Sequence, residues 1–205
     1  MGRNGHSWCQ SKGVQTLNLF VLSECPVEAA QLQCNAHINK MTVESAQMLS
    51  TAHRMLDGHA EKQPSKSGKR LSTHYTHPDS KLDSILYKAV HYHHPCTAWT
   101  MYTSANYEWH YRHFVALAQE FAYRYEKQHR SYMILKDILK SPPKNIPKGQ
   151  QTDWPLAMGS NPECMFEGDA VRSYRAFYQT KQERFRMVWS KRPVPNWFKL
   201  KETTT

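Results

Sequence analysis

The chain has 205 residues, with 27 lysines and arginines against 17 acidic residues, a formal net charge of +10 and a pI near 9.4. It is long enough for one domain with its own core, and no apolar run approaches the roughly 18 residues of a membrane span. The five cysteines are scattered without a CxxC pair, so the sequence encodes neither a zinc knuckle nor a disulfide framework. We therefore expect a soluble, monomeric protein of a reducing cytoplasm, with no cofactor.

The positive charge favours a polyanionic partner. Aromatic residues make up 12% of the chain and are interleaved with basic ones, which is typical of nucleic-acid binding. We expect a nucleic acid as the partner. The alternative is a basic protein without a nucleic-acid partner, because charge alone names no activity.

The chain begins with a stretch that we place outside the fold. Residues 1–16 are polar and contain glycines, so we expect a disordered extension. Residues 17–22 form an apolar run, too short to distinguish a strand from a buried extended lead-in. Pro26 favours a short helix over residues 26–34, since proline fits the first helical turn.

Residues 33–58 carry two stripes of a helix. At about 100° per residue, the apolar stripe holds Ile38, Met41, Ser45, Met48, Leu49, Ala52, Met55 and Leu56. A polar stripe lies beside it and consists of His37, Lys40, Glu44, Gln47 and Thr51. We expect the apolar stripe to face the core, the polar stripe to lie at the rim of a cleft, and Gly58 to end the helix.

Residues 58–79 are rich in Ser, Lys, His, Gly and Pro and show no apolar period, which predicts a long basic loop. Loops of this length are usually functional or disordered. Four basic residues suit contacts with DNA phosphates: Lys62, Lys66, Lys69 and Arg70. The alternative is a solvated insertion.

A helix capped by Asp79 or Ser80 and marked by apolar residues up to Ala89 leads to the run His91-Tyr92-His93-His94. We predict no metal site there, because adjacent side chains point in different directions and no HxxxH or Cys/His pair completes a tetrahedral set. Packing, capping or a phosphate contact is expected instead, and His94 is the candidate for DNA.

The rest of the chain predicts further helices and an irregular connection. The predicted segments are a long helix or bent pair over 96–129, a helix over 131–139, an irregular connection over 141–168, a last helix over 169–190, and an aromatic segment 192–199 that packs back before a tail at 201–205. On the last helix, Val171, Tyr174, Phe177 or Tyr178, Phe185 and Val188 are expected inward and Arg172, Arg175, Lys181, Arg184 and Arg186 outward, with Arg172 and Arg175 as candidate DNA contacts. The sequence thus predicts a single all-α domain over residues 17–200, with long irregular loops and at most one short N-terminal strand.

Several stretches together resemble a family of small phage-encoded proteins commonly labelled pyrimidine-dimer DNA glycosylase. The resemblance covers about residues 17–199. The stretches that carry it are NLFVLSECPVEAAQLQCNAHINKMTVESAQMLSTAHR, YKAVHYHHPCTAW, NYEWHYRHF, EFAYRYEKQH, PPKNIP and KRPVPNWF.

A fainter similarity links the chain to the endonuclease V type of DNA-repair glycosylase. His37 and Glu44 keep the spacing of that enzyme's histidine and catalytic glutamate, His94 and the aromatic run after it resemble its GHVxFFYDK segment, and RPVPNWFK resembles its RPTWYKYYGK. The resemblance implies a DNA-repair enzyme that acts on double-stranded DNA in the cytoplasm of a phage-infected host cell. The chain departs from these patterns at three points. About 16 residues precede the region that matches the endonuclease V type, so no terminal threonine matches that enzyme's nucleophile, and Val43 stands where that enzyme has an arginine. Residues 33–37 read QCNAH where some members of the phage family have His-Cys-Asp-Lys-His.

A glycosylase that also cleaves the strand needs an amine nucleophile for C1′, a carboxylate for the sugar cation and the protons, and a means of extruding the base. Lys40 and Glu44 can supply the first two, and His37 can contact phosphate or move a proton. The alternative for the pair is an ordinary i,i+4 contact worth about 0.2–0.5 kcal/mol, with His37 capping the helix. Processing near Leu17 or Asn18 would expose another amine. The competing functions are a non-catalytic phage DNA-binding or host-interaction protein and a histidine-dependent metal nuclease.

Overall fold

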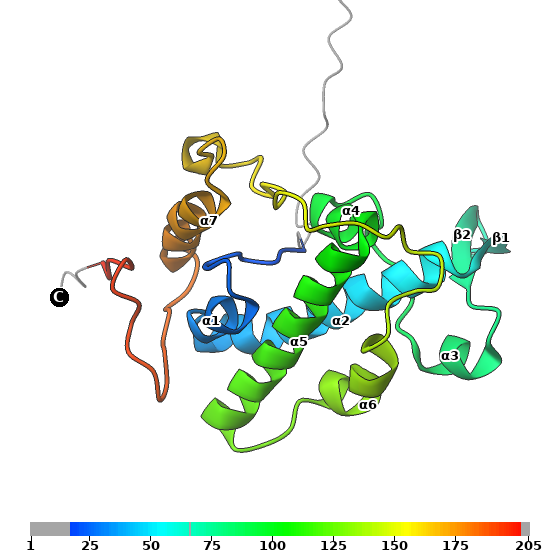
Figure 1. Ribbon diagram of the computed structural model, residues 1–205, viewed down its shortest axis with the longest axis horizontal. Helices are drawn as coiled ribbons and strands as arrows, with labels where there is room; N and C mark the ends of the chain where they lie inside the picture. Colours follow the sequence, from blue (N-terminus) through cyan, green and yellow to red (C-terminus); the bar gives the residue numbers. More distant parts are fainter. Residues whose placement is uncertain (1–16, 66, 202–205) are drawn as a thin grey trace, which may run out of the picture.

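Two long helices cross at the centre of the molecule. Helices α2 (Asn35–Leu56) and α5 (Ser104–Tyr125) pack against each other, and the other elements surround this pair (Figure 1). The computed structural model describes residues 17–65 and 67–201. Within this part it contains seven α-helices and one two-stranded sheet, so the predicted mainly α fold is confirmed. The predicted extension 1–16, Lys66 and most of the tail lie outside the described residues.

The shorter elements include the predicted helices with different lengths, together with two strands and two 3-10 helices that the sequence did not predict. They are α1 (Pro26–Gln31), β1 (His59–Pro64), β2 (Leu71–Thr76), α3 (Ser80–Ile85), α4 (Pro95–Tyr102), α6 (Arg130–Leu139), the 3-10 helix η1 (Pro162–Cys164), α7 (Ala170–Gln179) and the 3-10 helix η2 (Thr180–Glu183). In the described residues, no helix is long and apolar enough to span a bilayer.

Local side chains explain where several helices begin. The Asp79 side chain accepts from the backbone N–H groups of Lys81 and Leu82 and caps α3. Between α4 and α5, Thr103 has an extended backbone, and its side chain accepts from the N–H of Asn106. A threonine in this conformation is a favourable N-cap, so it ends one helix and starts the next. The segment is therefore the bent pair, not one continuous helix.

The predicted loop at 58–79 is wrong over residues 59–64 and 71–76, which form the two strands of an antiparallel β-hairpin. His59 pairs with Thr76, and Pro64 pairs with Leu71. The hairpin continues directly from the end of α2 and projects from one end of the molecule (Figure 1). The side chains of β1 are mostly exposed and those of β2 mostly half-buried, so the two strands are joined by their ladder of backbone hydrogen bonds and have no fully buried face.

The lead-in at 17–22 is buried but forms no strand. Leu19, Val21 and Leu22 are at most 1% exposed and belong to the core cluster that α2, α5 and α7 share. The possible N-terminal strand is therefore wrong, and the buried extended alternative holds. The segment runs between α1 and α4 (Figure 1).

The last predicted helix is wrong in its second half. Helix α7 ends at Gln179, and the chain continues through η2 into an irregular segment. Val188, expected inward, is 43% exposed, whereas Lys181, expected outward, is 8% exposed. The aromatic segment does pack back, because Phe198 is buried against Trp189 and Tyr178.

Candidate functional site

A pocket lies against the first half of α2. It has a volume of about 320 Å³ and is lined by Leu17, Lys40, Val43, Glu44, Gln47, Val90 and His91. Lys40, Glu44 and Gln47 are three of the five residues of the predicted polar stripe, and their i+3/i+4 spacing brings them to one side of the helix. The lead-in supplies the opposite contact through Leu17.

Glu44 is the buried charge of this pocket. The residue is 5% exposed; its Oε1 lies 3.3 Å from Lys40 Nζ, and its Oε2 accepts the backbone N–H of Asn18 at 3.1 Å. Burial raises the pKa of the Glu44 carboxyl, although Lys40 and the Asn18 N–H act in the opposite direction. A carboxyl with a raised pKa holds its proton to higher pH than an exposed one, which is a property of general acids and bases.

The lead-in is fixed where it meets this carboxylate. The Asn18 side chain donates from Nδ2 to the carbonyl of Ala157 at 3.1 Å, and its Oδ1 accepts the N–H of Phe20 at 2.9 Å. The backbone nitrogen of Asn18 therefore has one defined position, next to Glu44.

The far wall of the pocket is tied to the same helix. Thr51 Oγ1 donates to the carbonyl of Gln47 at 2.7 Å and accepts the N–H of Val90 at 3.2 Å. His91 follows in a left-handed backbone conformation with φ 49°, which turns the chain at the rim. Thr51, the fourth residue of the polar stripe, thus holds the wall in place.

The structure does not bring His37 into the pocket lining. Its ring stacks on Phe20 at 4.7 Å, meets Phe185 edge-on at 5.3 Å, and has Nδ1 2.8 Å from the hydroxyl of Tyr178. Burial, followed by the charges of Lys40 and Lys181, lowers the pKa of His37 to about 3. His37 is therefore neutral near pH 7 and packs among aromatic rings.

Lys181 is a second amine beside this aromatic cluster. Its Nζ lies 3.4 Å from the centroid of the Phe177 ring and 6.0 Å from that of Phe20. Burial is the main reason why the pKa of Lys181 falls to about 8, and the charges of Arg184 and Lys40 add to it. The sequence offered no signal for this, because a continuous helix would have placed Lys181 outward.

The candidate DNA contacts lie in separate places. Lys62, Lys69 and Arg70 are exposed on the hairpin, and Lys62 Nζ donates to Thr73 Oγ1 at 3.0 Å. Lys66 lies outside the described residues. Because the hairpin and α7 stand at opposite ends of the molecule, these residues form no patch with the arginines of α7 (Figure 1).

The two arginines of α7 contact aromatic rings. The Arg172 guanidinium lies 3.9 Å from the ring centroid of Phe166, and that of Arg175 lies 5.3 Å from Trp197. Both arginines line a pocket of about 590 Å³. His94 is half-buried and caps α4, since its Nδ1 accepts the N–H of Cys96.

Histidine and carboxylate side chains converge at the other end of α2. There, one potential metal-ligating atom each from His53, Asp57 and His77 lies within 4.8 Å of the others. In the parts of the chain that the structure describes, the run at 91–94 contributes to no such group. The sequence signal that could have found part of the cluster is the His-x-x-x-Asp spacing on α2.

Comparisons with protein families, with curated proteins and with solved structures found no match.

Proposed function

We propose that the protein is a DNA glycosylase and abasic-site lyase that acts on damaged or modified pyrimidines by amine chemistry. The observation that carries this proposal is the buried Glu44 carboxylate, which lies in a pocket between the Lys40 amine and the backbone nitrogen of Asn18. The family resemblance of the lead-in and α2 supports the same reaction.

The reaction needs an amine and a carboxylate at the same sugar. The amine attacks C1′ and displaces the base, which leaves with a proton. The C1′–O4′ bond of the sugar ring then breaks as O4′ takes up a proton, and the nitrogen lone pair forms the C=N bond of an imine between protein and sugar. Glu44 would stabilise the positive charge that develops on the sugar and move the protons. Elimination from the imine then breaks the strand, so no metal or organic cofactor is required.

Two amines fit this scheme. Lys40 is in the pocket already, with its side chain 43% exposed and thus reachable by DNA. The other arises if processing makes Leu17 or Asn18 the first residue, because Leu17 lines the pocket and the Asn18 nitrogen lies 3.1 Å from Glu44. The resembling enzymes use a terminal amine, which favours the second, with Lys40 then in a supporting role.

Exposed positive charge would bring DNA to this pocket. The formal charge of +10 attracts the negatively charged duplex at distances shorter than the Debye screening length. The hairpin presents Lys62, Lys69 and Arg70 free of ion pairs within the described residues. A two-stranded antiparallel ribbon also has the width that the major groove admits.

Borohydride trapping tests the proposal. Duplexes with an abasic site or a cyclobutane dimer are incubated with the full chain and with a chain released from a cleavable fusion so that Leu17 comes first. We expect a covalent adduct, and we expect Glu44→Gln to lower the rate at which it forms by about 10²–10⁴-fold. Loss of the adduct in Lys40→Ala assigns the nucleophile to Lys40. If the adduct survives when Lys40→Ala is made in the chain that starts at Leu17, the nucleophile is the amine of the new N-terminus.

Lys127→Ala is the matched control, since Lys127 is an exposed lysine on a different part of the surface. If neither chain forms an adduct or cuts either duplex, the glycosylase proposal is wrong.

The second candidate is a non-catalytic DNA-binding or host-interaction protein. The observation in its favour is that Lys40 and Glu44 form a regular i,i+4 pair and that Glu44 also anchors the lead-in. This candidate predicts salt-dependent duplex binding that is unchanged in Glu44→Gln. Multiple turnover on any DNA substrate would exclude it.

A further inference from the structure

A cluster of two histidines and one aspartate lies where α2 meets the hairpin. His53 and Asp57 are four residues apart and so lie on one side of the end of α2. His77 follows β2 and returns to the same place because the hairpin is antiparallel. One ligand atom from each of the three lies within 4.8 Å of the others.

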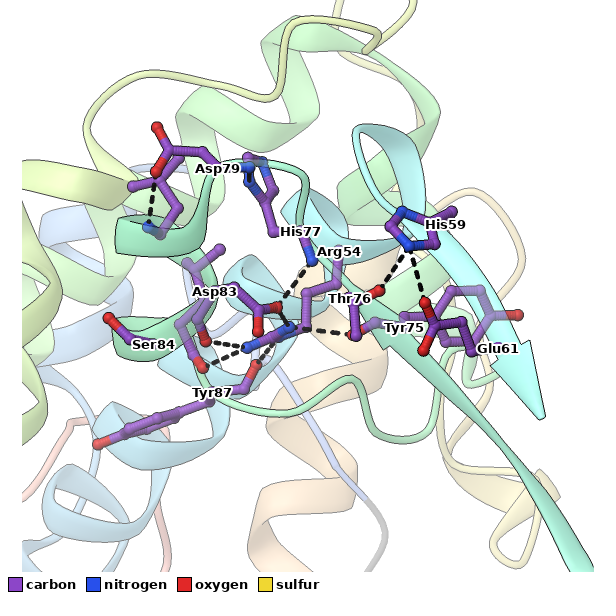
Figure 2. A network of polar contacts seen from close by, with 12 residues as sticks. Arg54, His59, Glu61, Tyr75, Thr76, His77, Asp79, Asp83, Ser84 and Tyr87 are labelled. Atoms are coloured by element: carbon purple, nitrogen blue, oxygen red, sulfur yellow. Dashed lines mark hydrogen bonds and ion pairs between the residues drawn. The ribbon is translucent and has the colours of Figure 1, made fainter. Parts of the chain in front are cut away.

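A buried arginine fixes this arrangement. Arg54 donates to the carbonyls of Tyr75, Tyr87 and Leu86 and to both the carbonyl and the carboxylate of Asp83 (Figure 2). The same Asp83 carboxylate accepts the backbone N–H of His77 at 2.7 Å. The hairpin end and α3 are thus bound to α2 at the residue next to His53, and His77 has a defined position.

We propose that His53, Asp57 and His77 form a binding site for a divalent transition-metal ion of the zinc type. Two imidazoles and one carboxylate are a donor set that Zn²⁺ accepts, with a water molecule in the fourth position. The three side chains come from two elements, so a bound ion would join the hairpin to α2.

The hydrogen bonds of His53 support a metal ligand at Nδ1. Tyr107 donates its hydroxyl proton to the carbonyl of Leu139 at 2.9 Å, so its oxygen accepts from His53 Nε2, also at 2.9 Å. A neutral His53 therefore carries its proton on Nε2 and keeps the lone pair on Nδ1. Metal-bound histidines typically donate their second N–H to such a partner, which orients the ring.

His77 supplies an unsatisfied nitrogen. Its Nε2 is buried and has no hydrogen-bond partner among the residues that the structure describes. Its Nδ1 accepts the N–H of Asp79 at 3.1 Å. Metal binding at Nε2 places the ring proton on Nδ1 and breaks this contact, which leaves an exposed N–H that water can satisfy. A buried polar atom without a partner otherwise costs stability, and a bound ion removes that cost.

Asp57 is oriented for the same role. Its Oδ2 accepts the backbone N–H of Lys144 at 2.8 Å and its Oδ1 that of Asn145 at 2.9 Å. Each carboxylate oxygen retains a second lone pair for a metal. The site is separated from Glu44 by 9 to 13 residues of α2, about 13–20 Å at 1.5 Å per residue, so it is independent of the proposed imine chemistry.

Zinc titration of the full chain, freed of metal with a chelator, tests the site by isothermal calorimetry. We expect one Zn²⁺ per chain, with affinity at least tenfold lower in His77→Gln and in Asp57→Asn. The matched control is His74→Gln, which removes a histidine from the same hairpin and should leave the affinity unchanged. Absence of binding to the unchanged chain, or equal binding in His77→Gln, would overturn the proposal.

Cobalt substitution provides a readout that does not depend on the folding of a variant. Co²⁺ in a four-coordinate site gives strong visible absorption bands, which Zn²⁺ should remove by displacement. The weak bands of six-coordinate Co²⁺ at one equivalent would contradict the three-ligand site.

Discussion

At the scale of single residues, the burial of the Glu44 carboxylate should reduce the stability of the protein. Its folded pKa lies above the unfolded value because burial disfavours the ionised form. The folded state therefore holds the Glu44 proton more tightly than the unfolded state. The unfolding free energy falls as the pH rises from the unfolded pKa of Glu44 to its folded pKa. Near pH 7 the ionised carboxylate is a net cost.

Glu44→Gln should therefore make the protein more stable while it removes the proposed lyase activity. Glutamine keeps an oxygen for the Asn18 N–H and carries no charge, so we expect the unfolding free energy at pH 7 to rise by about 1 kcal/mol. The gain should shrink as the pH is lowered towards the ordinary carboxyl range, because the raised pKa of Glu44 lets the folded protein protonate this side chain. Urea unfolding at pH 7 and in this lower range measures the gain.

The paired control is Glu28→Gln, because Glu28 is exposed and lies outside the pocket. A destabilised Glu44→Gln variant at pH 7 would mean that the carboxylate is a net stabilising group, contrary to this account.

The sequence could not separate His37 from Glu44, although both belong to the predicted polar stripe. Helical periodicity gives the direction of a side chain but not what packs against it. Phe20 and Phe185, which lie far away in sequence, enclose His37, whereas the lead-in leaves a pocket over Lys40 and Glu44. Only the tertiary structure decides between packing and a site.

At the scale of elements, helices were predicted well where caps and an apolar stripe agree. The hairpin was missed because His59–Pro64 reads HAEKQP, which has no alternation of apolar and polar residues and includes a proline. The last helix was predicted too long because Lys181–Met187 is rich in helix-forming residues. Contacts of Lys181 with Phe177 and of Phe185 with His37 override this local preference.

Arg54 is expected to control the docking of the hairpin. It makes five hydrogen bonds to residues of the hairpin end, α3 and the segment after it. Arg54→Met keeps much of the side-chain volume but leaves buried carbonyls without donors, so we expect a loss of about 3 kcal/mol. Hydrogen exchange should show faster exchange across Leu71–Thr76.

Arg70→Met is the matched control, since Arg70 is an exposed arginine of the same hairpin. Equal exchange rates in both variants would show that the ladder and other contacts hold the hairpin without Arg54.

If the hairpin contacts DNA, its basic residues should determine part of the salt dependence. Neutralising Lys62, Lys69 and Arg70 to Gln removes up to three phosphate contacts, which reduces the slope of log K against log salt by about 3. Fluorescence anisotropy on one duplex over a range of salt concentrations measures the slope. The control neutralises three exposed lysines elsewhere, Lys127, Lys140 and Lys148. Equal slopes for both triple variants would place the DNA contact elsewhere.

At the scale of the whole molecule, two apolar clusters share the crossing helices α2 and α5. One joins them to the lead-in, α7 and the C-terminal segment, and the other to α6 and the segment after it. Four histidines on the two crossing helices are buried, His37, His53, His110 and His113, and a fifth buried histidine, His129, directly precedes α6. Burial is the largest cause that lowers the pKa of each, to about 3 for His37 and to about 4 for His53 and His113.

Because of these histidines, we expect the whole protein to unfold in mildly acidic solution. As the pH falls below 6.5, the unfolded chain takes up protons on all four histidines, whereas burial keeps the four rings of the folded chain neutral well below that pH. Each histidine then removes up to about 1.4 kcal/mol of stability per pH unit, so four remove roughly 5 kcal/mol between pH 7 and 5.5. Glu44 acts in the opposite direction, but it is a single group, whereas His129, whose pKa is also lowered by burial, acts in the same direction as the four. Because domains are marginally stable, we expect urea unfolding to show a loss of this size and the fold to be lost between about pH 6 and 4.

Two variants test the role of the buried rings. His110→Asn should reduce the slope of unfolding free energy against pH by the equivalent of about one proton, and His93→Gln, at an exposed site, should not change this slope. A flat stability profile from pH 7 to 5.5 would show that these rings are protonated in the folded state.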